Sequence, residues 1–252
     1  MAAAGPRPNA VACTAAVGAC GTASRWEHAL ALLGLIDRPD ALPFNAALTA
    51  CGRAARWEQA LALLGLVARA ALEPTAVTSS AALLALLAGG RLQEAMGMYR
   101  QDVETGSLPD PWKGDRVLDL HGLPTEVALV AVMAALADAL CVAPRTGGLD
   151  VVTGRGLHSP GGEAVVAPAV RTLLLEELQV QIASGSESPL GRARLPVESL
   201  RGLSRRYGTD KGEAMRGKEK MQDTAALADV EKRRLDSYTE QIAGVGGTQS
   251  GR

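Results

Sequence analysis

A carboxylate and an imidazole stand two positions apart in the middle of the chain, where Asp119 and His121 belong to the run LDLHG at 118–122. The alternation of apolar and polar residues over 116–122 predicts a β-strand, in which successive side chains point to opposite faces. Leu118 and Leu120 then share the buried face, and Asp119 and His121 project together from the other. A carboxylate beside an imidazole can orient the ring and stabilise its charged form, as general acid–base chemistry requires.

A second run with candidate chemistry, TGRGLHSPGG, occupies 153–162. Its glycines allow backbone amides to approach an anion closely, and Ser159-Pro160 is typical of the start of a helix, whose N-terminus favours negative charge. We therefore expect a phosphate ligand. The candidate phosphate-binding residues are Thr153, Gly154, Gly156, His158 and Ser159.

Alternating strands and helices must bring these two runs together. The pattern predicts strands at 116–122, 149–152 and 192–197, with helices at 124–140 and 163–178 between them, and this order indicates a small α/β layer fold. If the first two strands are parallel through a right-handed crossover, both runs leave the sheet at its carboxyl end, where open α/β sheets bind ligands.

The first 110 residues contain three related units. RWEHALALLGL at 25–35 recurs as RWEQALALLGL at 56–66, and ACG at 19–21 recurs at 50–52, both at a spacing of 31 residues; GRLQEA at 90–95 is a weaker third copy. Each unit closes on a Pro followed by a small polar residue, and the next begins with an x-Val/Leu-x opening. We take the units as 10–40, 41–75 and 76–110, with 1–9 as the end of a preceding unit or a disordered start.

Within each unit the pattern predicts two helices joined by a short turn. In the second unit, 45–51 forms one amphipathic stretch, Gly52 to Ala55 break it, and 57–67 forms the next. A pair of such short helices cannot bury its apolar face alone, so stacked pairs are expected to form an α-solenoid.

Composition and charge restrict the class of protein. The 252 residues are 47% hydrophobic and 21% charged with a net charge of -1, as in soluble globular proteins. The longest apolar stretch, 127–143, is too short to span a bilayer, and the first ten residues lack the features of a secretory signal or a transit peptide. The cysteines at 13, 20, 51 and 141 have no zinc-site spacing, which predicts no metal centre and a reducing compartment. We expect a monomer that does not bind membranes.

The repeated units resemble the pentatricopeptide repeat family. The resemblance rests on a unit of about 35 residues, the terminal Pro-Asp, the opening FNAAL at 44–48, and the alanines at 29, 60 and 95. Tetratricopeptide-type hairpins, which bind peptides, are the neighbouring alternative. The pentatricopeptide resemblance implies single-stranded RNA read one nucleotide per repeat, with the fifth and last residues of each unit selecting the base.

Three residue pairs hold those base-selecting positions: Thr14 with Asp40, Asn45 with Thr75, and Ser80 with Asp110. By the family's code the first and third pairs favour guanine, and the second is uninformative or favours pyrimidines. Short polar side chains also cap helices and form turns, so each pair has a purely structural alternative.

Residues 115–200 resemble the Smr (small MutS-related) domain through LDLHG at 118–122 and TGRG at 153–156. SPLG at 188–191 replaces the Asn-Pro-Gly turn expected before the last strand. The predicted fold class is therefore mainly α with an α/β C-terminal domain, an α-solenoid of helical-hairpin repeats followed by a small βαβαβ Smr domain. This combination is found in plant and algal organelle proteins, so it implies RNA processing in a plastid or mitochondrion.

The Smr resemblance implies nuclease activity, on RNA more than on DNA. His121 would act as general base toward a ribose 2′-hydroxyl, Asp119 would orient the imidazole, and Arg155 would neutralise charge on the phosphate, with His158 as a candidate acid. The alternatives are a structural Asp119–His121 pair that closes the strand end and an exposed loop position for His158. A two-metal mechanism needs several carboxylates, so we predict no cofactor, although a divalent ion such as Mg²⁺ can take part.

Charge is distributed unevenly along the chain. Residues 10–110 carry 7 Arg and no Lys against 9 acidic residues, a charge of -2, whereas 201–252 carry 11 basic and 8 acidic residues, a charge of +3, as expected of a charged, partly helical or disordered tail. Because phosphate neutralisation supplies most non-specific affinity, the three repeats alone should bind RNA weakly. The sequence favours an RNA-processing endonuclease, and leaves open a non-catalytic RNA- or DNA-binding module and a peptide-binding scaffold.

Overall fold

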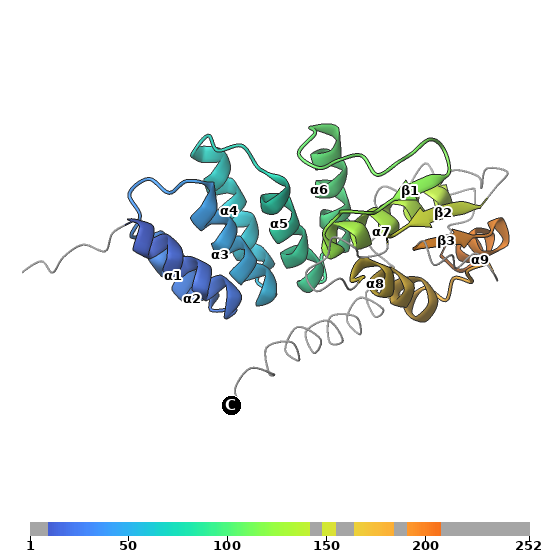
Figure 1. Cartoon of the computed structure of the whole chain (residues 1–252), viewed down its shortest axis with the longest axis horizontal. Helices are drawn as coiled ribbons and strands as arrows, with labels where there is room; N and C mark the ends of the chain where they lie inside the picture. The colour runs from blue at the N-terminus through green and yellow to red at the C-terminus, as the bar shows by residue number, and fades with distance from the viewer. Residues whose placement is uncertain (1–9, 142–147, 155–163, 184–190, 208–252) are drawn as a thin grey trace, which may run out of the picture. The chain divides into compact units, whose positions relative to one another are not determined.

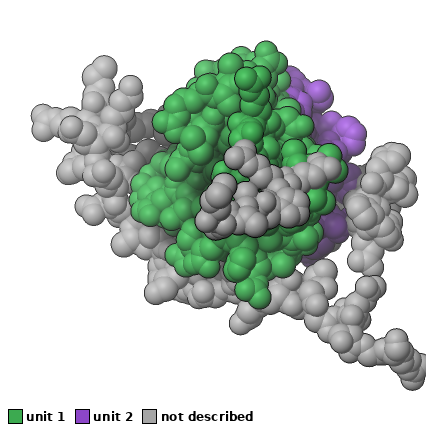
Figure 2. Space-filling view, turned by 90° about the vertical axis from the view of Figure 1, so that its left-hand side faces the viewer, with its two compact units in different colours: residues 1–108, 242–252 green, residues 109–241 purple. Residues whose placement is uncertain are grey.

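The computed structural model describes residues 10–141, 148–154, 164–183 and 191–207. This part of the chain is mainly helical with a small three-stranded sheet, which confirms the broad fold prediction (Figure 1). It divides into two compact units (Figure 2): residues 10–108, which we call the helical unit, and the described residues from 109 onward, the sheet unit. No helix within these ranges has both the length and the apolar character needed to cross a bilayer.

The helical unit consists of three helical hairpins in succession. Within each hairpin the two helices pack together, and the first helices of neighbouring hairpins pack against one another. The elements are α1 (Ala10–Thr22) and α2 (Trp26–Leu33), α3 (Ala41–Arg53) and α4 (Trp57–Arg69), and α5 (Ala76–Ala88) and α6 (Leu92–Glu104).

The same turn closes every hairpin. One residue takes a positive φ, and the arginine after it donates its backbone N–H to a carbonyl five residues earlier, as at the αL ends of many helices. The positive-φ residues are Ser24, Ala55 and Gly90, and the hydrogen bonds are Arg25 to Cys20 at 2.9 Å, Arg56 to Cys51 at 2.8 Å and Arg91 to Leu86 at 2.8 Å.

The glycine of the recurring ACG sequence lies inside a helix, so the prediction that Gly52 breaks its helix is wrong. A Cβ at Gly21 would lie 2.9 Å from the carbonyl oxygen of Ala46, and one at Gly52 would lie 3.1 Å from that of Ala81. Glycine is needed here because the first helices of adjacent hairpins approach closely, and the chain turns only at Ala54 and Ala55.

Arginine–tryptophan stacking also joins neighbouring hairpins. The guanidinium of Arg56 lies 5.1 Å from the ring centre of Trp26, and that of Arg91 lies 4.4 Å from the ring centre of Trp57. Gly89 makes room for Trp57, since a Cβ there would collide with the indole. Each contact is worth about 0.5–1 kcal/mol at exposed sites, and it recurs from one hairpin to the next.

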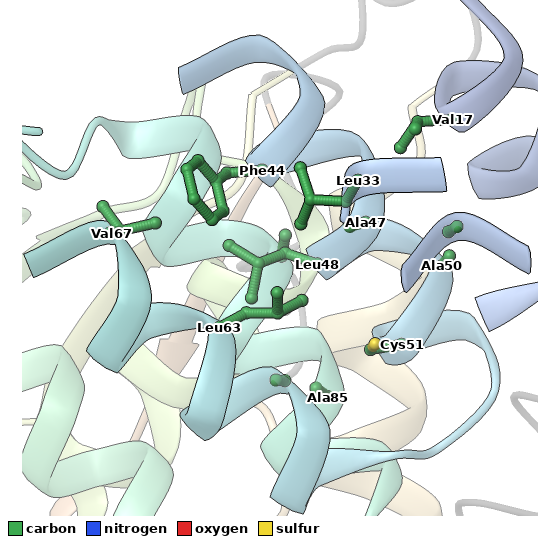
Figure 3. Packing of buried hydrophobic residues seen from close by; sticks show 13 residues of the cluster. Val17, Leu33, Phe44, Ala47, Leu48, Ala50, Cys51, Leu63, Val67 and Ala85 are labelled. Carbon is green, nitrogen blue, oxygen red and sulfur yellow. The ribbon is translucent and has the colours of Figure 1, made fainter. Parts of the chain in front are cut away.

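The core of the helical unit runs through its hairpins. Phe44 and Leu48 of α3 lie beside Leu63 and Val67 of α4, and Leu33 of α2 approaches from the preceding hairpin (Figure 3). The other residues of this buried cluster are mostly alanines, which allow the helices to pack closely.

The sheet unit alternates strands and helices, as predicted. Its elements are β1 (Val117–Asp119), α7 (Thr125–Cys141), β2 (Leu149–Val152), α8 (Val166–Thr172), the π-helical segment η2 (Leu173–Glu177), β3 (Arg192–Leu195) and α9 (Val197–Tyr207). The sheet order is β1-β2-β3, with β1 and β2 parallel, which is the condition under which the sequence analysis brought the two runs together, and β3 antiparallel to β2.

Three details of this unit differ from the sequence prediction. The first strand ends at Asp119 instead of 122, because the chain turns at Gly122, which has φ +78°. The second helix ends in a π turn, with the N–H of Leu178 bonded to the carbonyl of Leu173 at 3.0 Å. The last strand ends at Leu195 instead of Val197, because a further helix, α9, begins at Val197.

Candidate functional site

Asp119 and His121 meet at the end of β1. Oδ1 of Asp119 lies 3.2 Å from Nδ1 of His121 and also accepts the backbone N–H of His121 at 3.2 Å. Leu118 and Leu120 between and beside them are fully buried, and the N–H of Leu120 donates to the carbonyl of Val152 at 2.7 Å. Asp119 is the last residue of β1 and His121 lies in the turn that follows, so these two hydrogen-bond contacts hold the polar side chains together at the strand end.

The pairing determines which nitrogen of His121 faces outward. A carboxylate only accepts hydrogen bonds, so its contact with Nδ1 places the proton on that nitrogen and leaves Nε2 as the acceptor. The imidazole is 69% exposed, whereas the Asp119 side chain is 21% exposed. The arrangement is an oriented imidazole that can accept a proton from a molecule bound at the strand end.

The end of β2 and the start of β3 lie at the same edge of the sheet as Asp119. Thr153 donates both its backbone N–H, at 2.7 Å, and its hydroxyl, at 3.0 Å, to the carbonyl of Gly191. A Cβ at Gly154 would lie 3.2 Å from Cβ of His121, and one at Gly191 would collide with the carbonyl of Gly154. Since Gly154 and Gly191 also have φ of +77° and +65°, both positions require glycine, and Gly154 at the described start of the second run lies against His121 of the first.

Gly191 is a residue whose importance the sequence reasoning missed. The available signal was a glycine placed immediately before a predicted strand, which often marks a close backbone approach. The remaining predicted residues of this site, Arg155, Gly156, His158 and Ser159, lie outside the described residues, so their roles stay predictions.

Within the described ranges, no three His, Cys, Asp or Glu side chains group closely enough to hold a metal ion. Asp119 is the carboxylate that the strand ends bring to His121.

The three predicted fifth residues occupy the same place in the repeats. Thr14, Asn45 and Ser80 are each the fifth residue of α1, α3 and α5. Their surroundings differ, however. The Thr14 hydroxyl donates to the carbonyl of Ala10 at 2.9 Å, and Ser80 is only 7% exposed, with a hydroxyl that no described group bonds.

The three predicted last residues all hold local turns. Asp40 caps α3 by accepting the N–H of Leu42 at 3.1 Å, Thr75 caps α5, and Asp110, which belongs to the sheet unit, accepts the N–H of Trp112 at 2.9 Å. These three side chains therefore have the structural role that the sequence analysis gave as the alternative. To select a base as well, each would have to use its remaining lone pairs.

Asn45 and Thr75 of the second unit are nevertheless joined. The hydroxyl of Thr78 donates to Oδ1 of Asn45 at 2.8 Å and lies 3.1 Å from the hydroxyl of Thr75. This bridge crosses from α3 to the start of α5, so it brings the predicted pair into one hydrogen-bonded group and orients the amide of Asn45.

An exposed apolar residue precedes each fifth residue by three positions. Val11, Leu42 and Val77 are the second residues of α1, α3 and α5, with exposed fractions of 74%, 65% and 60%. Residues three apart share one face of a helix, so each apolar side chain lies beside a fifth residue. The sequence showed the x-Val/Leu-x opening, but its exposure became evident only in the structure. We call these three residues the apolar row.

Comparison with protein-family models and with curated proteins finds no match to this chain.

Proposed function

We propose that this chain is an RNA-binding protein in which an α-solenoid of pentatricopeptide-like repeats presents single-stranded RNA to an Smr-type endonuclease site. The observation that carries the proposal is the oriented, exposed imidazole of His121 at a strand end, held by Asp119 and backed by the glycine backbone at Gly154. Plastid or mitochondrial RNA processing is the setting that the sequence resemblance implies.

The chemistry is a transesterification within the RNA. Nε2 of His121 takes the proton of a ribose 2′-hydroxyl, and the 2′-oxygen attacks the adjacent phosphorus. The bond from phosphorus to the 5′-oxygen breaks, and that oxygen takes a proton from a general acid, for which His158 is the candidate. The products are a 2′,3′-cyclic phosphate and a 5′-hydroxyl, so the reaction needs no redox partner.

The apolar row supports single-stranded RNA as the ligand of the repeats. Exposed aliphatic side chains at regular spacing can contact the flat faces of unpaired bases, while the polar residue beside each one can hydrogen-bond a base edge. Asn45 is the best placed of these polar residues, because the Thr78 hydroxyl holds its carbonyl oxygen and leaves its amide hydrogens for a ligand.

A non-catalytic nucleic-acid clamp is the second candidate function. It is favoured by the second hydrogen bond of Asp119, whose Oδ1 accepts the backbone N–H of His121 as well as the ring nitrogen. This double contact closes the strand end locally, so the pair also has a structural role that needs no chemistry.

The test is cleavage of 5′-labelled single-stranded RNA by the purified full chain, with and without EDTA. A strand of the same sequence with 2′-deoxyribose at every position serves as the control. We expect cleavage of the RNA to 2′,3′-cyclic ends and none of the deoxy strand. Binding of RNA without cleavage would support the clamp, and cleavage of the deoxy strand would overturn the proposed 2′-hydroxyl chemistry.

A further inference from the structure

The strand register places two arginines on the same face of the sheet as Asp119. Across the three strands, Asp119 lies opposite Val152, which lies opposite Arg192; in the next row, Val117 lies opposite Asp150, which lies opposite Arg194. Directly paired residues share a face. Leu118, Val151 and Leu195 point to the other face, where they are fully buried.

Burial differs between the cations and the anion of this face. The Arg192 and Arg194 side chains are 49% and 56% exposed, while Asp150 between them is 19% exposed. Nη2 of Arg192 donates to Asp150 at 3.1 Å, and Nε of Arg194 lies 3.8 Å from the same carboxylate. The carboxylate of Asp150 is therefore the more buried partner, and the two guanidinium groups that contact it are the more exposed.

We propose that Arg192 and Arg194 form a phosphate-contact surface that holds the RNA strand flanking the cleavage site. This inference rests on the function proposed above. A guanidinium carries five N–H donors in a planar fork that suits phosphate oxygens, and the hydrogen bond of Arg192 to Asp150 orients that fork while using one donor.

Distance identifies the part of the RNA that this surface would touch. Arg192 lies two strands away from Asp119, and strands are about 4.8 Å apart, so the two positions are separated by about 10 Å. The arginines are thus placed for a neighbouring phosphate and not for the one that reacts.

Overall charge shows why local cations are needed. Residues 111–200 carry 7 basic and 10 acidic residues, a charge of -3. Because the segment as a whole repels a polyanion, attraction of RNA to the strand end has to come from cations concentrated on one face. Arg192 and Arg194 are such a pair, on the same face of the sheet as Asp119, with Arg192 about 10 Å from it.

The experiment compares the full chain with Arg192→Gln, Arg194→Gln and the double variant, by single-turnover cleavage over a range of RNA and salt concentrations. We expect the double variant to raise the half-saturating RNA concentration about tenfold. The slope of log affinity against log salt should fall by about 1.4, because two phosphate contacts on a single strand are lost. The double variant should change the half-saturating RNA concentration more than the cleavage rate at saturating RNA. Replacement of both arginines by lysine should restore most of the affinity.

Arg201→Gln is the matched control, since Arg201 is an exposed arginine on α9 of the same unit. Cleavage with an unchanged half-saturating concentration and salt slope in the double variant would overturn this inference and leave the nuclease proposal standing. Failure of the parent chain to cleave or bind RNA would instead overturn the proposed function itself. Thermal melting of each variant checks its folding.

Discussion

The two units present their candidate residues in opposite ways. In the helical unit each hairpin contributes one residue to the apolar row and one fifth residue, so each candidate contact occurs three times. In the sheet unit Asp119, His121 and Gly154 each occur once and meet because strand ends converge. The repeats divide the free energy of RNA binding among equivalent contacts. Activity at the strand end instead depends on each residue of the site. Single substitutions should therefore have large effects in the sheet unit and small ones in the helical unit.

The largest expected effect is that of His121→Ala. Removal of a general base costs on the order of 10²- to 10⁴-fold in rate, so single-turnover RNA cleavage should fall by that amount. RNA affinity should stay within about threefold, as one exposed ring contributes little to phosphate binding. His28→Ala is the control, since His28 is an exposed histidine on α2. Equal loss in both variants would contradict a special role for the strand end.

Gly191→Ala should have the next largest effect, which is a loss of folding stability. Its φ of +65° costs a non-glycine residue about 1–2 kcal/mol, and the collision of the new Cβ with the Gly154 carbonyl adds to this. We expect a loss of about 3 kcal/mol in the free energy of unfolding, measured by denaturant titration. Gly202→Ala on α9, where a Cβ meets nothing within 4 Å, should cost nothing. A tolerated Gly191→Ala would show that the strand ends do not converge as described.

Leu42→Ala tests the divided energy of the repeats. Loss of the apolar contact of one leucine side chain costs about 1 kcal/mol, or about fivefold in RNA affinity, and the folding stability should change little because Leu42 is 65% exposed. Leu35 is 61% exposed but lies outside the apolar row, so Leu35→Ala should leave affinity unchanged. Filter binding measures both variants, and identical affinities would remove the apolar row from the RNA-binding surface.

The smallest effect concerns Glu126 in the first turn of α7. Burial raises the pKa of this carboxyl above its ordinary value of 4.5, and a backbone hydrogen bond partly offsets the shift. The unfolded chain then ionises first as pH rises, so folding stability falls from pH 4.5 upward and levels off above the raised pKa. Melting temperatures of Glu126→Gln should show less of this decline. Parallel curves for parent and variant would contradict a raised pKa.

The sequence predicted those features that follow from local pattern. Alternation of apolar and polar residues predicted that Leu118 and Leu120 are buried and that Asp119 and His121 lie together, and the alternation of strands and helices predicted the element order of the sheet unit. Repetition within the chain predicted that Thr14, Asn45 and Ser80 share a register. Each of these follows from the period of a strand, of a helix or of the repeat.

The features that were missed depend on contacts between distant residues. The sequence pattern predicted a helix break at Gly52, because the contact of Gly52 with Ala81 on the next hairpin cannot be seen in the sequence. The burial of Ser80 and the link from Asn45 through Thr78 to Thr75 likewise depend on how two hairpins pack. Gly191 could not be assigned to the site because its partner Gly154 lies on another strand.

Asp119→Asn tests the central claim most directly. Asparagine keeps the size of the side chain and its hydrogen-bonding capacity but removes the charge that stabilises an imidazolium at His121. We predict that single-turnover cleavage of labelled RNA falls at least on the order of 10²-fold, while filter binding shows RNA affinity within about threefold of the parent and melting shows an intact fold. A variant that cleaves as fast as the parent would show that the Asp119–His121 pair is structural and would contradict the catalytic assignment.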